Sequence, residues 1–300
     1  LPPNVIVSIK NTRDDFDLTE PASELIGVGG GGDRQIVEFD SWGEYMGCNS
    51  YPCYIGDILA ERMKLSAAKG VRRVATRLCW EPFENYIFDR PWGNEVNVYV
   101  YAKLAEDSNR DPDDLLREWI AIRYPKKARK AAFTLYKRSS SLQLVWLHFK
   151  GQSANSHSCI QWANFSSYDK LRKQINADSG EDYLFPREDL EKRRRDIDAA
   201  YREAKKHIAA LGPSVPENRR EEILAGATAQ WNMAHGVTDQ MELYSIHLAV
   251  QRGEPMPDLS DIEKRIRLRA ETWKASDPKG FELFRGDQPL ALFEKLKTAR

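Results

Sequence analysis

Short apolar runs alternate with helical repeats along the first hundred residues of the chain. Three runs rich in β-branched residues predict buried strands, and they are Val5–Ile9, Gln35–Phe39 and Val71–Leu78. Apolar residues recur at helical spacing over Tyr54–Lys69 and again over Asn94–Glu106. Because strands that alternate with helices require crossover connections, this order predicts a parallel sheet.

Glycines mark two boundaries within this region. Gly70 follows the first helical repeat directly and predicts the end of that helix. The run Gly27–Gly32 predicts a loop. It precedes a strand instead of opening a helix, so we do not expect it to bind phosphate.

From Asp111 onward the pattern is helical only. Asp111 and Pro112 form a strong helix start, with a capping carboxylate followed by a proline in the first turn. The stretch 155–185 is polar and less regular, and the basic run Lys192–Arg195 lies among acids, which predicts a solvated helix face. Further helices are predicted at 113–123, 126–149, 187–211, 217–251 and 259–274.

These elements predict an α/β fold, namely the last strands and helices of a (β/α)₈ TIM barrel followed by an all-α C-terminal region. The expected domains are 1–110, the C-terminal portion of the barrel, and 111–300, the helical domain. Three strands cannot close a barrel, and an exposed sheet edge favours aggregation. We therefore expect either the missing N-terminal half of the barrel or a homo-oligomer partner to cover that edge.

Composition excludes several classes of function. The 300 residues carry 45 basic and 45 acidic side chains, so no general attraction to nucleic acid is expected. No apolar run reaches the length needed to span a bilayer, and we expect no membrane partner. Four cysteines are too few for a disulfide scaffold, and no metal, nucleotide or flavin motif is present. No cofactor is therefore predicted, and the cellular compartment is left open.

Two of the predicted strands lead into acidic segments. Asp15 follows the first strand and Glu44 follows the second, 29 positions later. Strands that deliver carboxylates at their C-terminal ends are typical of catalytic sites in barrels, and paired carboxylates carry glycoside hydrolysis. Aromatic side chains that suit stacking on sugar rings accompany the acids, among them Trp42, Tyr45 and Trp80.

Two segments joined by a glycine-bearing loop resemble the late barrel strands of the α-glucuronidases of glycoside hydrolase family 67. They are Ile9-Lys-Asn-Thr-Arg-Asp-Asp-Phe16 and Gln35-Ile-Val-Glu-Phe-Asp-Ser-Trp-Gly-Glu-Tyr-Met-Gly47. The segments Asn94–Leu104 and Asp111–Trp119 are similar to the family's last barrel helix and to the entry into its helical region. Two departures stand out: Thr12-Arg13 occupies the place of the family's proline, and the segment Cys79–Glu84 does not follow the family pattern.

The resemblance implies an inverting hydrolysis of a terminal sugar, a uronic acid in the family, from a plant-type polysaccharide such as xylan or from an oligosaccharide. Asp15 and Glu44 would lie on the water-activating side, and the general acid would be a glutamate upstream of this chain. Lys10 would contact the sugar carboxylate. The remaining expected substrate-binding residues are Asn11, Trp42, Tyr45, Trp80 and Glu81.

Two alternatives to this interpretation remain open. In the first, Glu81 or Glu84, which follow the third predicted strand, act as the nucleophile of a retaining glycosidase. In the second, the chain is a non-catalytic carbohydrate-binding or scaffold protein whose helical region mediates assembly.

Overall fold

The structure of the chain is a computed structural model, and helices make up most of the residues that it describes. These residues fall into two compact units: residues 1–141 with 206–223 form unit 1, and residues 142–205 with 224–300 form unit 2. The predicted division into domains 1–110 and 111–300 is not tested by these units and stays a prediction. The structure describes residues 5–11, 24–28, 32–39, 51–76, 95–149, 152–153, 167–175, 184–283 and 285–298.

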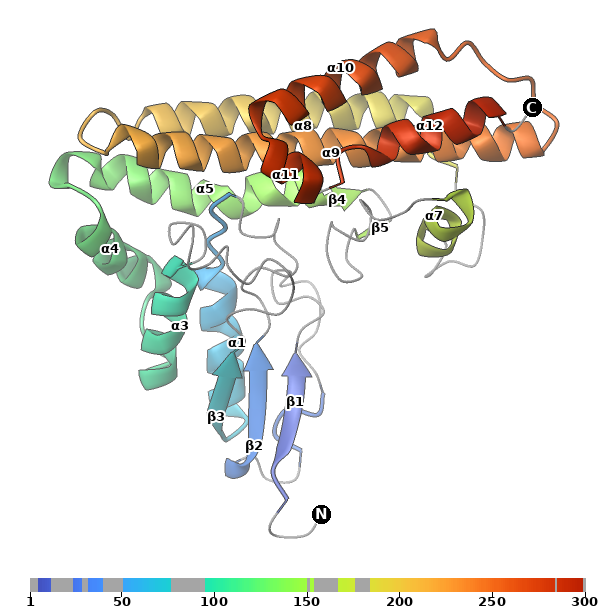
Figure 1. The fold of residues 1–300 in the computed structure, drawn as a ribbon. Helices are drawn as coiled ribbons and strands as arrows, with labels where there is room; N and C mark the ends of the chain where they lie inside the picture. Colours follow the sequence, from blue (N-terminus) through green and yellow to red (C-terminus); the bar gives the residue numbers. More distant parts are fainter. Residues whose placement is uncertain are drawn as a thin grey trace. The chain divides into compact units, whose positions relative to one another are not determined.

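Unit 1 contains a three-stranded parallel sheet in the order β1-β2-β3 (Figure 1). Its strands are β1 (Val7–Asn11), β2 (Gly32–Phe39) and β3 (Val71–Thr76). Helix α1 (Gly56–Ala68) connects β2 to β3, which is the crossover that parallel strands require. The three predicted strands and their parallel pairing are therefore confirmed, although β1 begins and ends two residues later than the predicted Val5–Ile9.

The rest of unit 1 is helical. It contains α3 (Glu95–Glu106), α4 (Pro112–Arg123), the short 3₁₀ helix η2 (Lys126–Ala128) and the first part of α5 (Arg129–Leu147). The predicted start of α4 is confirmed, because the carboxylate of Asp111 accepts a hydrogen bond from the backbone N–H of Asp113 at 2.7 Å. Trp119 of α4 and Tyr136 of α5 are buried against each other, with their ring centroids 5.0 Å apart.

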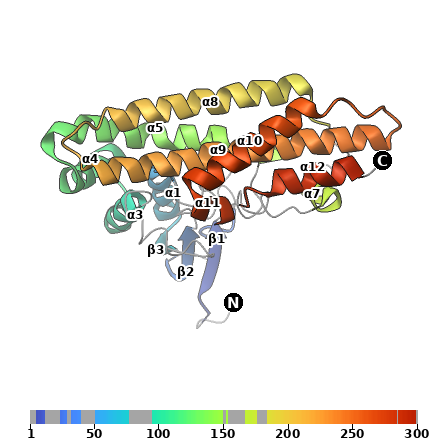
Figure 2. The ribbon, with the colours of Figure 1, turned by 45° about the horizontal axis from the view of Figure 1, so that its top comes forward.

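Unit 2 is built from long helices, and α8, α9 and α10 lie side by side in both ribbon views (Figures 1 and 2). Its apolar core joins residues of α9, α10 and α12 to Tyr168, Leu171 and Phe185. The middle of α9, residues 232–241, is buried on all sides, so this part of the helix lies at the centre of the unit. The elements are α7 (Tyr168–Ile175), most of α8 (Arg187–Ala209) and of α9 (Glu217–Gln251), α10 (Ser260–Ser276), α11 (Pro278–Leu283), α12 (Gln288–Thr298), and the two-residue strands β4 (His148–Phe149) and β5 (Gln152–Ser153). The end of α8 and the start of α9 belong to unit 1.

The predicted fold class, the end of a (β/α)₈ TIM barrel followed by an all-α region, is wrong. The described residues form a predominantly helical protein with one small parallel sheet, whereas such a barrel closes with eight strands. The error has a physical cause. Alternating strands and helices predict parallel pairing, but they do not reveal whether the sheet grows further or gives way to helix-on-helix packing.

Smaller differences concern individual elements. Helix α5 ends at Leu147, two residues before the predicted end, and is followed by β4, which pairs with β5 in antiparallel fashion. Gly32 begins β2, although the glycine run was expected to be loop throughout. Helices α7, α11 and α12 were not predicted, because they are short and lie in polar or proline-bearing sequence.

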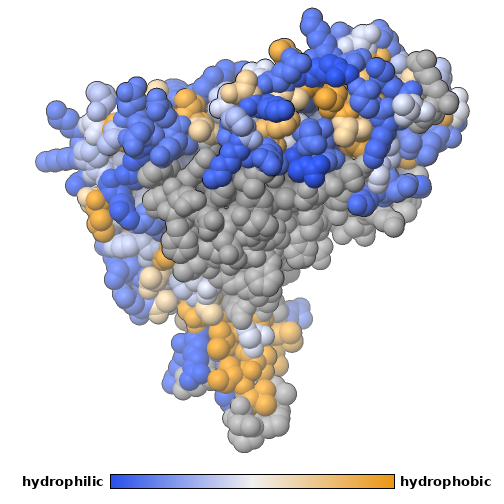
Figure 3. Space-filling model, in the orientation of Figure 1, coloured by the Kyte–Doolittle hydropathy of each residue, from blue (hydrophilic) through white to orange (hydrophobic). Residues whose placement is uncertain are grey.

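Apolar side chains lie exposed next to the sheet. Figure 3 shows an apolar patch over β1 and β2, and three residues beside these strands are more than half exposed: Ile6 (51%), Leu25 (61%) and Val28 (63%). Among the described strands, β1 pairs with β2 alone.

Candidate functional site

The carboxyl ends of the three parallel strands form the place where the sequence predicts a site. Asn11 is paired with Phe39 across β1 and β2, and Phe39 is paired with Thr76 across β2 and β3. The last residues of all three strands therefore stand in one row. Each of the three segments that carry the predicted acids leaves the sheet from this row.

The predicted site residues fall into two groups. Lys10 and Asn11 belong to the last two positions of β1, where Lys10 is paired with Glu38 of β2. The structure thus brings the β1 pair to the carboxyl edge of the sheet. The others lie outside the described residues: Asp15, Trp42, Glu44, Tyr45, Trp80, Glu81 and Glu84.

Buried hydrogen bonds from Asn97 and Ser139 hold residues 53–55, which follow the segment that carries Glu44. We call this set of hydrogen bonds the clamp. The side-chain amide of Asn97 in α3 donates to the carbonyl of Cys53 at 2.5 Å and accepts from the backbone N–H of Ile55 at 3.0 Å. The hydroxyl of Ser139 in α5 accepts from the backbone N–H of Tyr54 at 2.9 Å. Because these groups are buried, each backbone atom of the segment needs such a partner.

A second set of contacts anchors the same segment through the ring of Tyr54. The Tyr54 hydroxyl donates to the carbonyl of Pro112 at 2.6 Å. The Lys137 ammonium bridges Asp57 at 2.6 Å and Asp113 at 2.8 Å. Burial, with the nearby carboxylates of Asp57 and Asp113, raises the pKa of Tyr54. The hydroxyl is thus a permanent donor, and its role is to fix the start of α1.

Two residues next to Tyr54 are explained by this packing. Gly56 is required because a Cβ atom there would lie 2.1 Å from the Tyr54 hydroxyl oxygen. Cys53 is a free and fully buried thiol, and burial raises its pKa. A buried neutral thiol is a poor nucleophile, so Cys53 packs and does not react.

Sequence reasoning did not single out Asn97 or Ser139. A signal for Asn97 exists: it lies on the face of α3 that also carries Val96, Val100 and Leu104, all of them buried. A polar residue on an apolar helix face has to find a buried partner. The partner itself, a backbone segment 42 to 44 residues earlier, cannot be read from the pattern.

A buried charge cluster in unit 2 was also not predicted. Asp239 of α9 is fully buried, and it accepts from Arg194 of α8 at 3.1 Å and from Arg265 of α10 at 3.0 Å. Arg269 forms an ion pair with the other carboxylate oxygen. Glu242 pairs with Arg194 at 2.5 Å and also with Arg265. The cluster joins three helices, and its pairing is typical of structural ion networks.

The basic run at the start of α8 contributes to this interior. The sequence predicts a solvated face there, and Lys192 and Arg195 are indeed exposed. Arg193 and Arg194 instead turn inward, and Arg193 donates to the carbonyl of Trp146 at 2.9 Å and to the hydroxyl of Thr238 at 3.1 Å. The prediction is therefore wrong for the two central arginines, since consecutive helical positions face different sides.

His235 of α9 forms a further polar contact in unit 2. Its Nε2 lies 2.9 Å from a carboxylate oxygen of Asp198, which also accepts from the indole N–H of Trp231 at 2.7 Å. Burial lowers the pKa of His235 to about 4, and the charges of Arg269 and Arg194 act in the same direction. The imidazole is therefore neutral at pH 7 and donates a structural hydrogen bond.

Two features are absent from the described part of the chain. It contains no group of three or more histidine, cysteine, aspartate or glutamate side chains arranged to hold a metal ion. No described helix combines the length and the apolar character that crossing a membrane requires.

Comparison with known proteins gives little further guidance. No protein-family model matches the chain. A curated protein named probable terpene synthase 12, from Ricinus communis, is 29% identical over 102 residues. The match covers 33% of this chain and 16% of that protein, so the chain spans only a small part of the length of this relative. A similarity of this extent does not show the family.

Proposed function

We propose that the chain belongs to a glycoside hydrolase that acts on an acidic sugar, with Asp15 and Glu44 on the water-activating side of the site. One observation supports this most directly: β1 and β2 are neighbours, parallel and in register, so that Asn11 stands beside Phe39. Asp15 follows Asn11 by four residues, and Glu44 follows Phe39 by five.

Chain geometry makes a shared site possible. Neighbouring strands lie about 4.8 Å apart, and an extended residue spans at most about 3.6 Å. The Cα atoms of Asp15 and Glu44 are thus within roughly 14 and 18 Å of two adjacent strand ends. The clamp on residues 53–55 further supports the proposal, because it holds the chain in a defined place soon after Glu44.

In the proposed reaction, one of the two carboxylates accepts a proton from a water molecule as that water attacks the anomeric carbon. The second carboxylate orients the water, and its proximity tunes the pKa of the first. Lys10, in the strand β1 that leads to Asp15, would neutralise the carboxylate of the sugar. The general acid that protonates the leaving oxygen is not assigned to a residue of this chain.

The test uses the full-length protein with an oligosaccharide that ends in a uronic acid. Asp15→Asn and Glu44→Gln should each lower kcat by about 10²–10⁴-fold, because general base catalysis is lost. Asp14→Asn and Asp40→Asn are matched controls in the same segments and should retain activity. Near-wild-type hydrolysis by both Asp15→Asn and Glu44→Gln would refute the assignment.

The configuration of the first product separates this proposal from its rival. Proton NMR of a fresh reaction should show inversion at the anomeric carbon. Retention would instead favour Glu81 or Glu84 as a nucleophile, and the pairing of Thr76 with Phe39 gives that alternative a neighbouring strand. Binding of the sugar without turnover would favour a carbohydrate-binding protein.

We also propose that the exposed apolar residues Ile6, Leu25 and Val28 are covered in the working protein, by another segment of the same protein or by a second copy. Large apolar side chains that stay exposed favour such association.

A further inference from the structure

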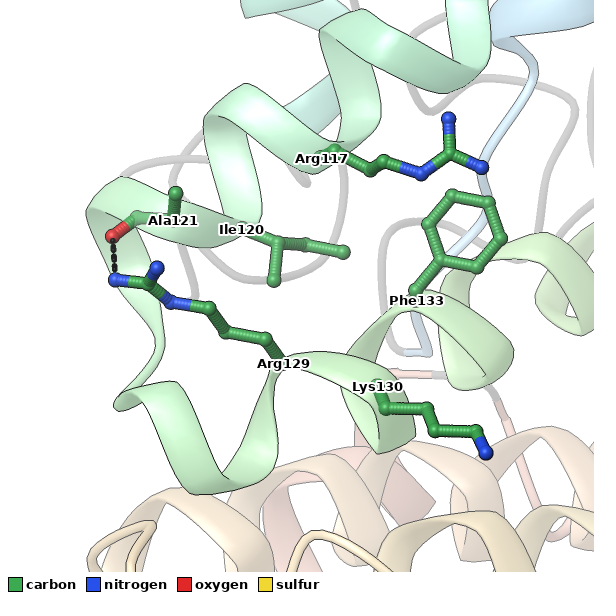
Figure 4. Close-up of a pocket in the computed structure, with 6 residues that line it drawn as sticks. All are labelled: Arg117, Ile120, Ala121, Arg129, Lys130 and Phe133. Atoms are coloured by element: carbon green, nitrogen blue, oxygen red, sulfur yellow. Dashed lines mark hydrogen bonds between the residues drawn. The ribbon is translucent and has the colours of Figure 1, made fainter.

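A groove between α4 and α5 is separate from the sheet and has no part in the function proposed above. It encloses about 510 Å³, a size typical of small-molecule sites. The lining comes from the second half of α4 and the first turns of α5: Arg117, Ile120, Ala121, Arg129, Lys130 and Phe133 (Figure 4). Three of these residues are apolar, three are cationic and none is acidic.

Hydrogen bonds and ring contacts hold the walls of the groove. The Arg117 guanidinium lies over the ring of Phe133, 4.7 Å from its centroid, and pairs with Asp114 at 2.9 Å (Figure 4). Arg129 donates to the carbonyls of Ala121 at 3.0 Å and Tyr124 at 3.2 Å, at the C-terminal end of α4. The groove is thus formed in the folded chain before any ligand arrives.

The positive charge at this groove is only partly compensated. Asp114, and at 4.0 Å Asp113, balance Arg117. Arg129 bonds to neutral carbonyls, and within the described residues neither Arg129 nor Lys130 has a carboxylate partner. An apolar floor with two uncompensated cations at its rim is complementary to a molecule that is apolar on one side and anionic on the other.

We propose that this groove binds a small amphipathic anion, an aromatic carboxylate in its simplest form. The flat apolar body lies on Phe133 and Ile120, and the carboxylate lies near the guanidinium of Arg129. The ammonium of Lys130 points in the opposite direction and contributes its charge from a longer range (Figure 4). A bare inorganic anion is a poorer ligand, because it would leave the exposed part of the Phe133 ring in water.

The test titrates the full chain with 2-naphthoate, followed by saturation-transfer NMR. A ligand of this size should bind with a dissociation constant of about 1 mM or tighter. The neutral analogue 2-naphthamide should bind several-fold more weakly, since it lacks the charge that meets the Arg129 guanidinium. Equal binding of the two compounds, or no saturable binding of 2-naphthoate, would overturn the proposal.

Variants locate the ligand. Ala121 is exposed and lines the groove, so Ala121→Trp should fill the space and abolish saturable binding without removing a charge. Lys130→Gln should weaken binding about threefold, as expected for one exposed charge. Lys126→Gln, the same change at a residue outside the lining, should leave binding unchanged.

Each variant can by itself show whether the ligand binds in this groove. Unchanged binding to a folded Ala121→Trp chain would place the ligand elsewhere and overturn the proposal. If Ala121→Trp does not fold, the comparison of Lys130→Gln with Lys126→Gln decides, and equal effects of these two substitutions would overturn it.

Discussion

The side-chain amide of Asn97 lies against the backbone of Cys53 and donates a 2.5 Å hydrogen bond to its carbonyl. The same amide accepts from the N–H of Ile55 at 3.0 Å, so one side chain satisfies two buried backbone groups. This contact ties α3 to the segment that enters α1. It is a long-range relationship that local sequence does not reveal.

Removing this amide should destabilise the protein strongly. Asn97→Ala leaves a buried carbonyl and a buried N–H without partners, and we expect a loss of about 3 kcal/mol in the free energy of unfolding. Urea denaturation followed by circular dichroism measures it. Asn109→Ala, at an exposed position, is the control. A loss below about 1 kcal/mol would mean that the clamp does not matter for stability.

His235 should make stability depend on pH. Its pKa is about 4 in the folded chain, below the ordinary value of 6.5, so the unfolded chain binds more protons between these values. The contribution of the neutral imidazole to the free energy of unfolding is complete above pH 6.5. It is lost as the pH falls toward 4, and the free energy of unfolding then decreases by up to about 1.4 kcal/mol per pH unit. His235→Gln should reduce the slope of unfolding free energy against pH in this window. An unchanged slope would contradict the assignment.

Asp239 should be among the most sensitive positions of unit 2. Asp239→Asn removes the carboxylate shared by Arg194, Arg265 and Arg269, and uncompensated buried charge typically costs about 3–5 kcal/mol. Asp196→Asn breaks an exposed pair with Lys192 and should change stability by less than about 1 kcal/mol. Similar midpoints for the two variants in urea would show that the cluster is not important for stability.

Gly70 should resist substitution for reasons of backbone conformation alone. Its φ is +80°, and a Cβ atom there would meet nothing within 4 Å. Gly70→Ala should therefore cost about 1–2 kcal/mol, and Gly70→Asn should cost less, because asparagine adopts this conformation more readily. Thermal denaturation measures both. Lys64→Ala, at an exposed position in α1, is the control, and equal losses for alanine and asparagine at position 70 would contradict the explanation.

The exposed apolar residues Leu25 and Val28 should drive association of the isolated chain. Leu25→Lys with Val28→Lys places charges on two residues that are more than 60% exposed, and sedimentation should show less self-association. Ile122→Lys is a matched control, because Ile122 is similarly exposed (67%) but lies in α4. An equal effect of the control would show that Leu25 and Val28 have no specific role in association.

Several local features followed from the sequence alone. The strands were predictable because β-branched residues cluster in them, and the start of α4 because Asp111 and Pro112 provide a cap and a first turn. The parallel pairing of β2 and β3 followed from the helical connection between them. Such features depend on residues close together in the chain, where steric and capping effects act directly.

The tertiary structure decided what surrounds these elements. It showed that helices dominate and that the predicted barrel is wrong, because the strand–helix alternation does not state how many strands a sheet contains. It also revealed the partners of Asn97 and Asp239, which lie tens of residues away in sequence. Periodicity tells which face of a helix is buried, whereas only the packing of helices and strands determines which polar groups meet inside.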